Sequence, residues 1–115
     1  MKKISTRRGD IWIANLRWGE GNVLRGQHPV IIVSSDQTNR GSGIVTVVPL
    51  TSSAKPPMRC HVPVSGFGLR KESVALAEQL TTVSKARLCF RVGTLMHSEK
   101  MAELEQAIRH QLEVA

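Results

Sequence analysis

Residues 43–53, GIVTVVPLTSS, restrict the fold of this chain more than any other stretch. The β-branched run predicts a strand, and Pro49 near its end cannot donate a hydrogen bond to a sheet ladder. A proline in such a place marks an edge, an end or a bulge of a sheet, where side chains change direction. Three hydroxyl side chains follow at Thr51, Ser52 and Ser53. The stretch therefore predicts a strand that delivers polar groups to one point, and the alternative is a strand that runs into a solvated loop.

Most of the remaining chain also has the pattern of short strands. An apolar run at 11–16 predicts a strand covered on both faces, and a run at 29–35 predicts a strand that opens on a proline. Residues 17–26, rich in glycine, predict a loop that serves as a flexible lid. The other expected elements are a polar turn at 36–43, an edge strand at 59–64, strands at 73–77, 80–83 and 89–94, and one helical turn at 85–88.

The last part of the chain predicts a helix instead. Ser98 is a favourable N-cap with Glu99 in the first turn, and one apolar stripe follows at helical spacing through Met101, Leu104, Ile108 and Leu112. We expect this amphipathic helix to pack on the strands through that stripe. The expected fold is mainly β with short helices.

Length and composition narrow the class of protein. The 115 residues predict a single domain over 1–115, and 41% hydrophobic with 22% charged residues is typical of soluble globular proteins. The apolar runs are too short to cross a membrane, and the basic N-terminus continues into Gly9 and Asp10 rather than an apolar signal core. These features predict a protein of the cytoplasm that binds no membrane. Cys60 and Cys89 have neither paired metal spacing nor the density of a disulfide scaffold, so we expect two reduced core thiols.

The net charge of +7 at pH 7 is unevenly placed. Residues 98–115 carry more acidic than basic side chains, so the positive charge lies in the preceding part of the chain. A positive body favours a nucleic-acid partner, because Lys and Arg that contact phosphates release bound counterions. A basic surface without such a partner is the alternative.

Five segments resemble the MazF/PemK toxins in order and spacing. They are Arg8-Gly9-Asp10-Ile11-Trp12, His28-Pro29-Val30-Ile31-Ile32-Val33-Ser34, Pro49-Leu50-Thr51-Ser52, residues 68–73 and Glu78-Gln79-Leu80-Thr81-Thr82-Val83. The resemblance implies an SH3-like or PemK-type β-barrel with a C-terminal helix, acting as a homodimer without a cofactor. It implies an endoribonuclease that cuts single-stranded RNA at short sequences. It also implies a cognate antitoxin whose acidic segment lies in the RNA groove.

Cutting RNA without a metal ion uses the 2′-hydroxyl of the substrate as the nucleophile, which leaves a 2′,3′-cyclic phosphate and a 5′-hydroxyl. The site must accept one proton, donate another and stabilise charge on the phosphorane. The resemblance implies that Thr51 is essential, together with an arginine just before the strand-opening proline. His28 stands at that arginine position. Histidine can move protons near neutral pH but lacks the permanent charge of a guanidinium, so we hypothesise that Arg25 supplies the charge.

Further substrate contacts are expected from polar, basic and aromatic side chains near this site, namely Trp18, Ser52, Ser53, Lys55, Arg70, Lys71, Glu78 and Gln79. The basic and hydroxyl side chains also fit exposed turns, and the acid also fits a buried acceptor that ties the sheet to a loop. Trp18 either stacks on a base or anchors the 17–26 loop. The three other histidines, His61, His97 and His110, have no ligand spacing, so no metal site is expected.

Two other functions remain open from the sequence. CcdB-type toxins resemble this family in fold but bind DNA gyrase rather than cut RNA. The third possibility is a MazF-like binding protein without catalytic activity, which His28 in place of arginine favours. Cleavage of RNA in a chelator would separate the enzyme from both binding proteins.

Overall fold

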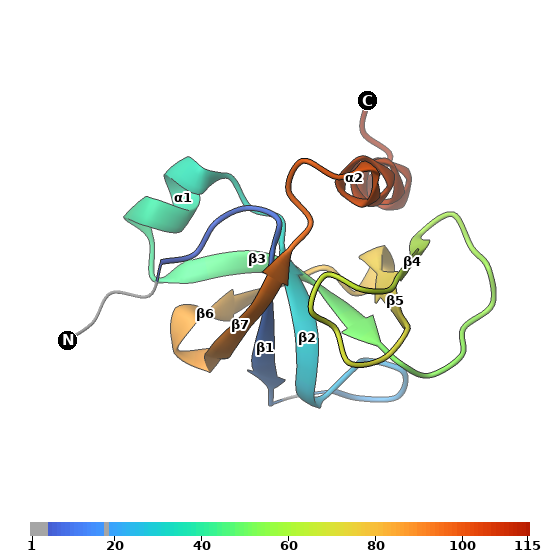
Figure 1. Ribbon diagram of the computed structural model, residues 1–115, viewed down its shortest axis with the longest axis horizontal. Coiled ribbons are helices and arrows are strands. Elements are labelled where there is room, and N and C mark those ends of the chain that lie inside the picture. The colour runs from blue at the N-terminus through green and yellow to red at the C-terminus, as the bar shows by residue number, and fades with distance from the viewer. Residues whose placement is uncertain (1–4, 18) are drawn as a thin grey trace.

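The computed structural model describes residues 5–17 and 19–115, and its centre is an antiparallel sheet (Figure 1). The elements, in chain order, are β1 (Asp10–Leu16), β2 (Gly26–Ile32), α1 (Asp36–Gly41), β3 (Ile44–Thr51), β4 (His61–Val64), β5 (Ser73–Leu76), η1 (Ala77–Gln79), β6 (Thr81–Ser84), η2 (Lys85–Arg87), β7 (Leu88–Thr94) and α2 (Glu99–Leu112). The prediction of a mainly β chain with a C-terminal helix is confirmed.

The sheet has the order β4-β5-β3-β2-β1-β7, and β6 pairs with β3 as well. Strand β3 therefore has three neighbours. It pairs with β2 through Val47, Val48 and Pro49, with β6 through residues 44–47 and with β5 through Leu50 and Thr51. Pro49 stands where β3 leaves β6 and meets β5, which is the break in the ladder that a proline in this strand predicts.

The central strands are buried on both faces, as the apolar run at 11–16 predicts. Ile11 packs in one core cluster and Trp12, the next residue, packs in another, because successive side chains of a strand point to opposite faces. Helix α2 covers the first cluster with Met101 and Leu104, and it lies beside β4 and η1 (Figure 1). The expected stripe ends early, since Leu112 at the end of the helix is 52% exposed.

Several local expectations differ from the structure. Strand β2 begins at Gly26 rather than at Pro29, because its first residues continue the pairing with β1. Ser98 is the N-cap residue of α2, but its hydroxyl donates to the Leu95 carbonyl, 2.5 Å away, rather than accepting from the helix. Both cysteines are free thiols, as expected, but only Cys60 is in the core and Cys89 is exposed.

Residues expected as a polar turn form the short helix α1. The Ser35 hydroxyl accepts a hydrogen bond from the Thr38 N–H and so caps the first turn. The buried Asn39 side chain donates to the Ser34 carbonyl at 3.0 Å, and the Asp36 carboxylate accepts from the Arg8 N–H at 2.7 Å. Side-chain hydrogen bonds thus hold a helix that has no apolar stripe to predict it.

Candidate functional site

The structure brings His28 of β2 close to the end of β3. The ladder between β2 and β3 ends at the pair Val30 and Pro49, and His28 and Thr51 each lie two residues beyond that pair. His28 Nδ1 lies 3.2 Å from the Leu50 carbonyl oxygen, the peptide group that precedes Thr51. A neutral ring that donates from Nδ1 to this carbonyl leaves Nε2 free to accept a proton.

Thr51 is the last residue of β3 and is 4% exposed. Its Oγ1 accepts a hydrogen bond from the Ser53 N–H at 3.2 Å. Because that bond uses a lone pair of the oxygen, the hydroxyl proton of Thr51 remains able to donate to another acceptor. The next residue, Ser52, is exposed.

A groove of about 670 Å³ opens beside these residues. Four of the predicted site residues line it together: His28, Ser52, Arg70 and Lys71. Sequence reasoning missed two others that line it, Phe90 and Arg91 of β7. Phe90 is an apolar side chain that is 60% exposed, and Arg91 Nε is 3.3 Å from an Asp10 carboxylate oxygen. The groove therefore combines cationic side chains with an exposed aromatic ring, which is a suitable surface for phosphates and unpaired bases.

The loop that carries Arg70 and Lys71 is held by a close approach of two backbones. A Cβ atom at Gly93 of β7 would lie 2.0 Å from the Phe67 carbonyl oxygen, and one at Gly68 would lie 2.3 Å from the Val92 carbonyl oxygen. Only glycine allows this contact. Because neither glycine carries a Cβ, the loop with Arg70 and Lys71 can pack directly against β7, at the side of the groove.

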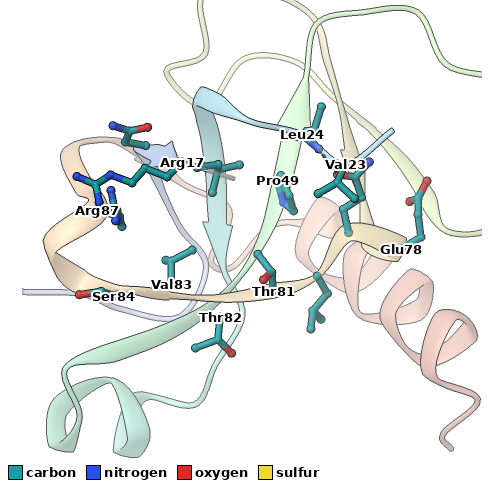
Figure 2. A pocket seen from close by; sticks show the side chains of 14 residues that line it. Arg17, Val23, Leu24, Pro49, Glu78, Thr81, Thr82, Val83, Ser84 and Arg87 are labelled. Carbon is teal, nitrogen blue, oxygen red and sulfur yellow. Dashed lines mark hydrogen bonds between the residues drawn. The ribbon is translucent and has the colours of Figure 1, made fainter. Parts of the chain in front are cut away.

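A second cavity, of about 440 Å³, lies between β1, the 19–25 loop and β6 (Figure 2). Figure 2 shows Arg17 and Arg87 together at one end and Glu78 at the other. Glu78 and Gln79, both predicted to contact substrate, line this cavity and not the groove beside His28. The structure therefore divides the predicted site residues between two places.

Gln79 has a clear structural role. Its side-chain Oε1 accepts from the Leu24 N–H at 2.7 Å, and its Nε2 donates to the Asn22 carbonyl at 2.8 Å. The side-chain amide thus satisfies two backbone groups of the 19–25 loop and links this loop to η1. The loop expected to act as a free lid is anchored at these two points.

The remaining predicted residues lie outside the two cavities. Arg25 is exposed just before β2, and its side chain is absent from the lining of either cavity among the described residues. Lys55 and Ser53 are exposed in the segment after β3, where Ser53 and Ser52 border a further pocket of about 460 Å³. The prediction for Trp18 lies outside the described residues.

Glu78 faces His61 as well as the second cavity. His61 Nε2 lies 2.6 Å from a Glu78 carboxylate oxygen, and His61 Nδ1 lies 2.8 Å from the Pro56 carbonyl oxygen. Burial lowers the pKa of His61, but the hydrogen bonds to Glu78 and Pro56 outweigh it, so the pKa of the ring is raised. The sequence left two roles open for Glu78, a substrate contact or a buried acceptor that ties the sheet to a loop. The pairing with His61 resembles the second role, although the carboxylate is partly exposed.

The sequence model of the PemK-like, MazF-like toxins of type II toxin–antitoxin systems matches residues 7–112. The chain belongs to this family. The match extends from the residues before β1 to the last residue of α2, so it covers the groove beside His28 and the second cavity alike. The family expected from the five segments is confirmed.

Two relatives carry a functional name. The chain is 31% identical over 115 residues to the endoribonuclease MazF9 of Mycobacterium tuberculosis, which covers 94% of this chain and 97% of the relative. It is 36% identical over 105 residues to the endoribonuclease MazF of Staphylococcus saprophyticus, which covers 89% of this chain and 87% of the relative. Both names agree with the enzyme class expected from the sequence.

Solved structures of this family share the fold. MazF of Deinococcus radiodurans superposes with a TM-score of 0.84 at 19% identity, over 97% of this chain and 100% of the other. A mycobacterial endoribonuclease solved in complex with its cognate antitoxin gives a TM-score of 0.81 at 21% identity, over 96% and 98%. In the described residues, no helix has the length and apolar character needed to cross a membrane.

Proposed function

We propose that this chain is a metal-independent endoribonuclease that cuts single-stranded RNA in the groove beside His28. The observation that supports it most is the position of His28, whose Nδ1 lies 3.2 Å from the Leu50 carbonyl oxygen, in a groove that also presents Arg70 and Lys71. This arrangement brings a proton acceptor and cationic side chains into one groove, and the buried hydroxyl of Thr51 lies next to Ser52, which lines it.

In the proposed reaction, His28 Nε2 accepts the proton of a ribose 2′-hydroxyl, while Nδ1 is held by the Leu50 carbonyl. The oxygen attacks the adjoining phosphorus and forms the cyclic phosphate, and the bond from phosphorus to the 5′-oxygen breaks. The leaving oxygen takes a proton from a water molecule and becomes a 5′-hydroxyl, and the proton held on His28 Nε2 then returns to the solvent. Thr51 Oγ1 donates to a phosphate oxygen as charge develops there. Because Thr51 is 4% exposed, we expect the segment that begins at Ser52 to shift when RNA binds.

Because His28 stands where the family resemblance implies an arginine, another side chain must supply the positive charge, and the groove offers candidates. Arg70 and Lys71 line it directly, whereas Arg25 is exposed in the segment before β2 and lines neither cavity. Arg91 also lines the groove, but Asp10 neutralises part of its charge. We therefore expect Arg70 and Lys71 to stabilise the phosphate more than Arg25 does, in place of the compensation hypothesised from sequence.

The partners follow from the same surface. A positive groove that accepts RNA also fits an acidic, extended protein segment, and the mycobacterial relative has been solved with its cognate antitoxin. We propose that a cognate antitoxin neutralises this chain by covering the groove. We further propose that the toxin acts in the cytoplasm as a homodimer.

The experiment is cleavage of a mixed-sequence oligoribonucleotide in excess chelator, followed by end-group analysis. Wild type should give 2′,3′-cyclic phosphate ends. Thr51→Val and His28→Ala should each reduce the rate by about 100-fold or more, since donors and general bases contribute on this scale. Thr94→Val is the matched control, because Thr94 also ends a strand and accepts the N–H two residues later, Met96, at 3.2 Å.

Two results would contradict the proposal. If wild type binds RNA without cutting it, the chain is a MazF-like binding protein without catalytic activity, the possibility that His28 in place of arginine favours. Equal rates in Thr51→Val, His28→Ala and Thr94→Val would place the reaction outside this groove.

A further inference from the structure

Three chemically different metal-binding groups meet away from the groove. Cys60 Sγ, a ring nitrogen of His61 and a Glu78 carboxylate oxygen lie within 4.8 Å of one another. Cys60 and His61 are adjacent at the start of β4, and Glu78 comes from η1, so the pairing of β4 with β5 brings them together. We propose that these three side chains bind a divalent cation of the zinc type.

The ring of His61 is already oriented as a metal ligand. Its Nδ1 is 2.8 Å from the Pro56 carbonyl oxygen, so this nitrogen carries a proton and donates it. Its Nε2 is 2.6 Å from a Glu78 carboxylate oxygen, which is also an acceptor. Two acceptors cannot face each other at this distance without a positive species between them. That species is a second proton in the metal-free state and a cation in the proposed complex. Histidines that bind zinc through one ring nitrogen usually donate the N–H of the other to a carbonyl or a carboxylate.

Two of the three groups are buried, so an ion bound between them would be partly shielded from water. Cys60 is 5% exposed, and the His61 side chain is also 5% exposed, whereas the Glu78 side chain is 33% exposed. Binding of a cation through Cys60 would require the thiol to lose its proton, which would be released to solvent.

The dimensions fit after one small movement. Ligand atoms around tetrahedral zinc stand roughly 3.4 to 3.6 Å apart, since zinc bonds are about 2.0 to 2.3 Å long. The present separations, from 2.6 Å up to the limit of 4.8 Å, bracket this range. Glu78 is the exposed member of the group and can turn without disturbing the core. Three protein ligands leave a fourth position for water.

The proposed ion would act on the structure and not in the reaction at His28. Glu78 is adjacent to Gln79, whose side chain holds the 19–25 loop. An ion that fixes Glu78 on β4 therefore also fixes η1, the support of that loop. The proposal is independent of the proposed nuclease activity, since its test measures binding alone.

The test is calorimetric titration of the full chain with zinc chloride, with cobalt(II) absorption as a second readout. Wild type should bind one zinc per protomer, raise its thermal midpoint and give a thiolate-to-cobalt charge-transfer band. Loss of an orienting partner weakens metal sites by about 10-fold to 100-fold, and loss of a ligand should cost at least as much. We expect that loss in Cys60→Ser and Glu78→Gln, and none in Cys89→Ser, which removes the exposed thiol.

The outcomes distinguish a specific zinc site from nonspecific binding of zinc to the protein surface. Absence of saturable zinc binding to wild type would overturn the proposal. Binding that persists unchanged in Glu78→Gln would also overturn it, and this variant decides the matter if Cys60→Ser fails to fold. Cobalt binding without the thiolate band would remove Cys60 from the site and overturn the proposed ligand set.

Discussion

The anchoring of the 19–25 loop by one side chain makes Gln79→Ala an informative change. The substitution removes two hydrogen bonds, from the Leu24 N–H at 2.7 Å and to the Asn22 carbonyl at 2.8 Å. A hydrogen bond contributes about 0.5 to 1.5 kcal/mol net, so the two together hold the loop by about 1 to 3 kcal/mol. Local opening should therefore become about 5-fold to 150-fold more frequent, while global unfolding changes less.

Native-state hydrogen exchange measures this directly at the Leu24 amide. We expect its exchange in Gln79→Ala to accelerate by that factor, while the Val48 amide in the core strand β3 exchanges as before. Gln106→Ala, which truncates an exposed glutamine on α2, is the matched control. Unchanged exchange at Leu24 would refute the reasoning, since the loop would then be held by something other than the Gln79 side chain.

Two further predictions concern stability. Gly93→Ala places a Cβ 2.0 Å from the Phe67 carbonyl oxygen, so the free energy of unfolding measured in urea should fall by about 1 to 3 kcal/mol. The control Gly43→Ala, where a Cβ meets open space, should change it little. Equal unfolding midpoints for the two variants would show that the loop moves aside freely. The hydrogen bond from the Arg8 N–H holds the pKa of Asp36 below its ordinary 3.8, so this carboxylate stabilises the fold above that pH and loses the effect as the pH falls through its lowered pKa. Asp36→Asn should therefore be less stable than wild type at about pH 6, with a difference that shrinks as the pH falls below 3.8, and a constant difference in urea unfolding would contradict this.

The sequence predicts much of the fold because its patterns are local. The β-branched run predicts β3, Pro49 predicts an irregularity in its ladder, and the spacing of Met101 and Leu104 predicts α2. Helix α1 escapes prediction because its support is tertiary. Its residues form no apolar stripe, and its Asp36 carboxylate accepts from the Arg8 N–H, which comes from 28 residues earlier in the chain.

The site is less predictable than the fold for the same reason. His28, Ser52, Arg70 and Lys71 could be selected from residue types and from the family resemblance, and the structure places them in one groove. Arg91 joins that groove only because β7 pairs with β1. The cluster of Cys60, His61 and Glu78 forms only when β4 pairs with β5. His61 and Glu78 are 17 residues apart in the sequence, so they match no familiar spacing of metal ligands.

The central claim is that the groove beside His28 aligns a ribose 2′-hydroxyl with the adjoining phosphorus. The most direct measurement uses an oligoribonucleotide that carries a single 2′-deoxy sugar at the position where wild type cuts, incubated in chelator. We expect this oligonucleotide to bind with unchanged affinity and to stay intact at that position, while its all-ribose counterpart is cut. Cleavage at the deoxy position at the ordinary rate would show that another nucleophile is used, and would contradict the assignment of His28 and Thr51.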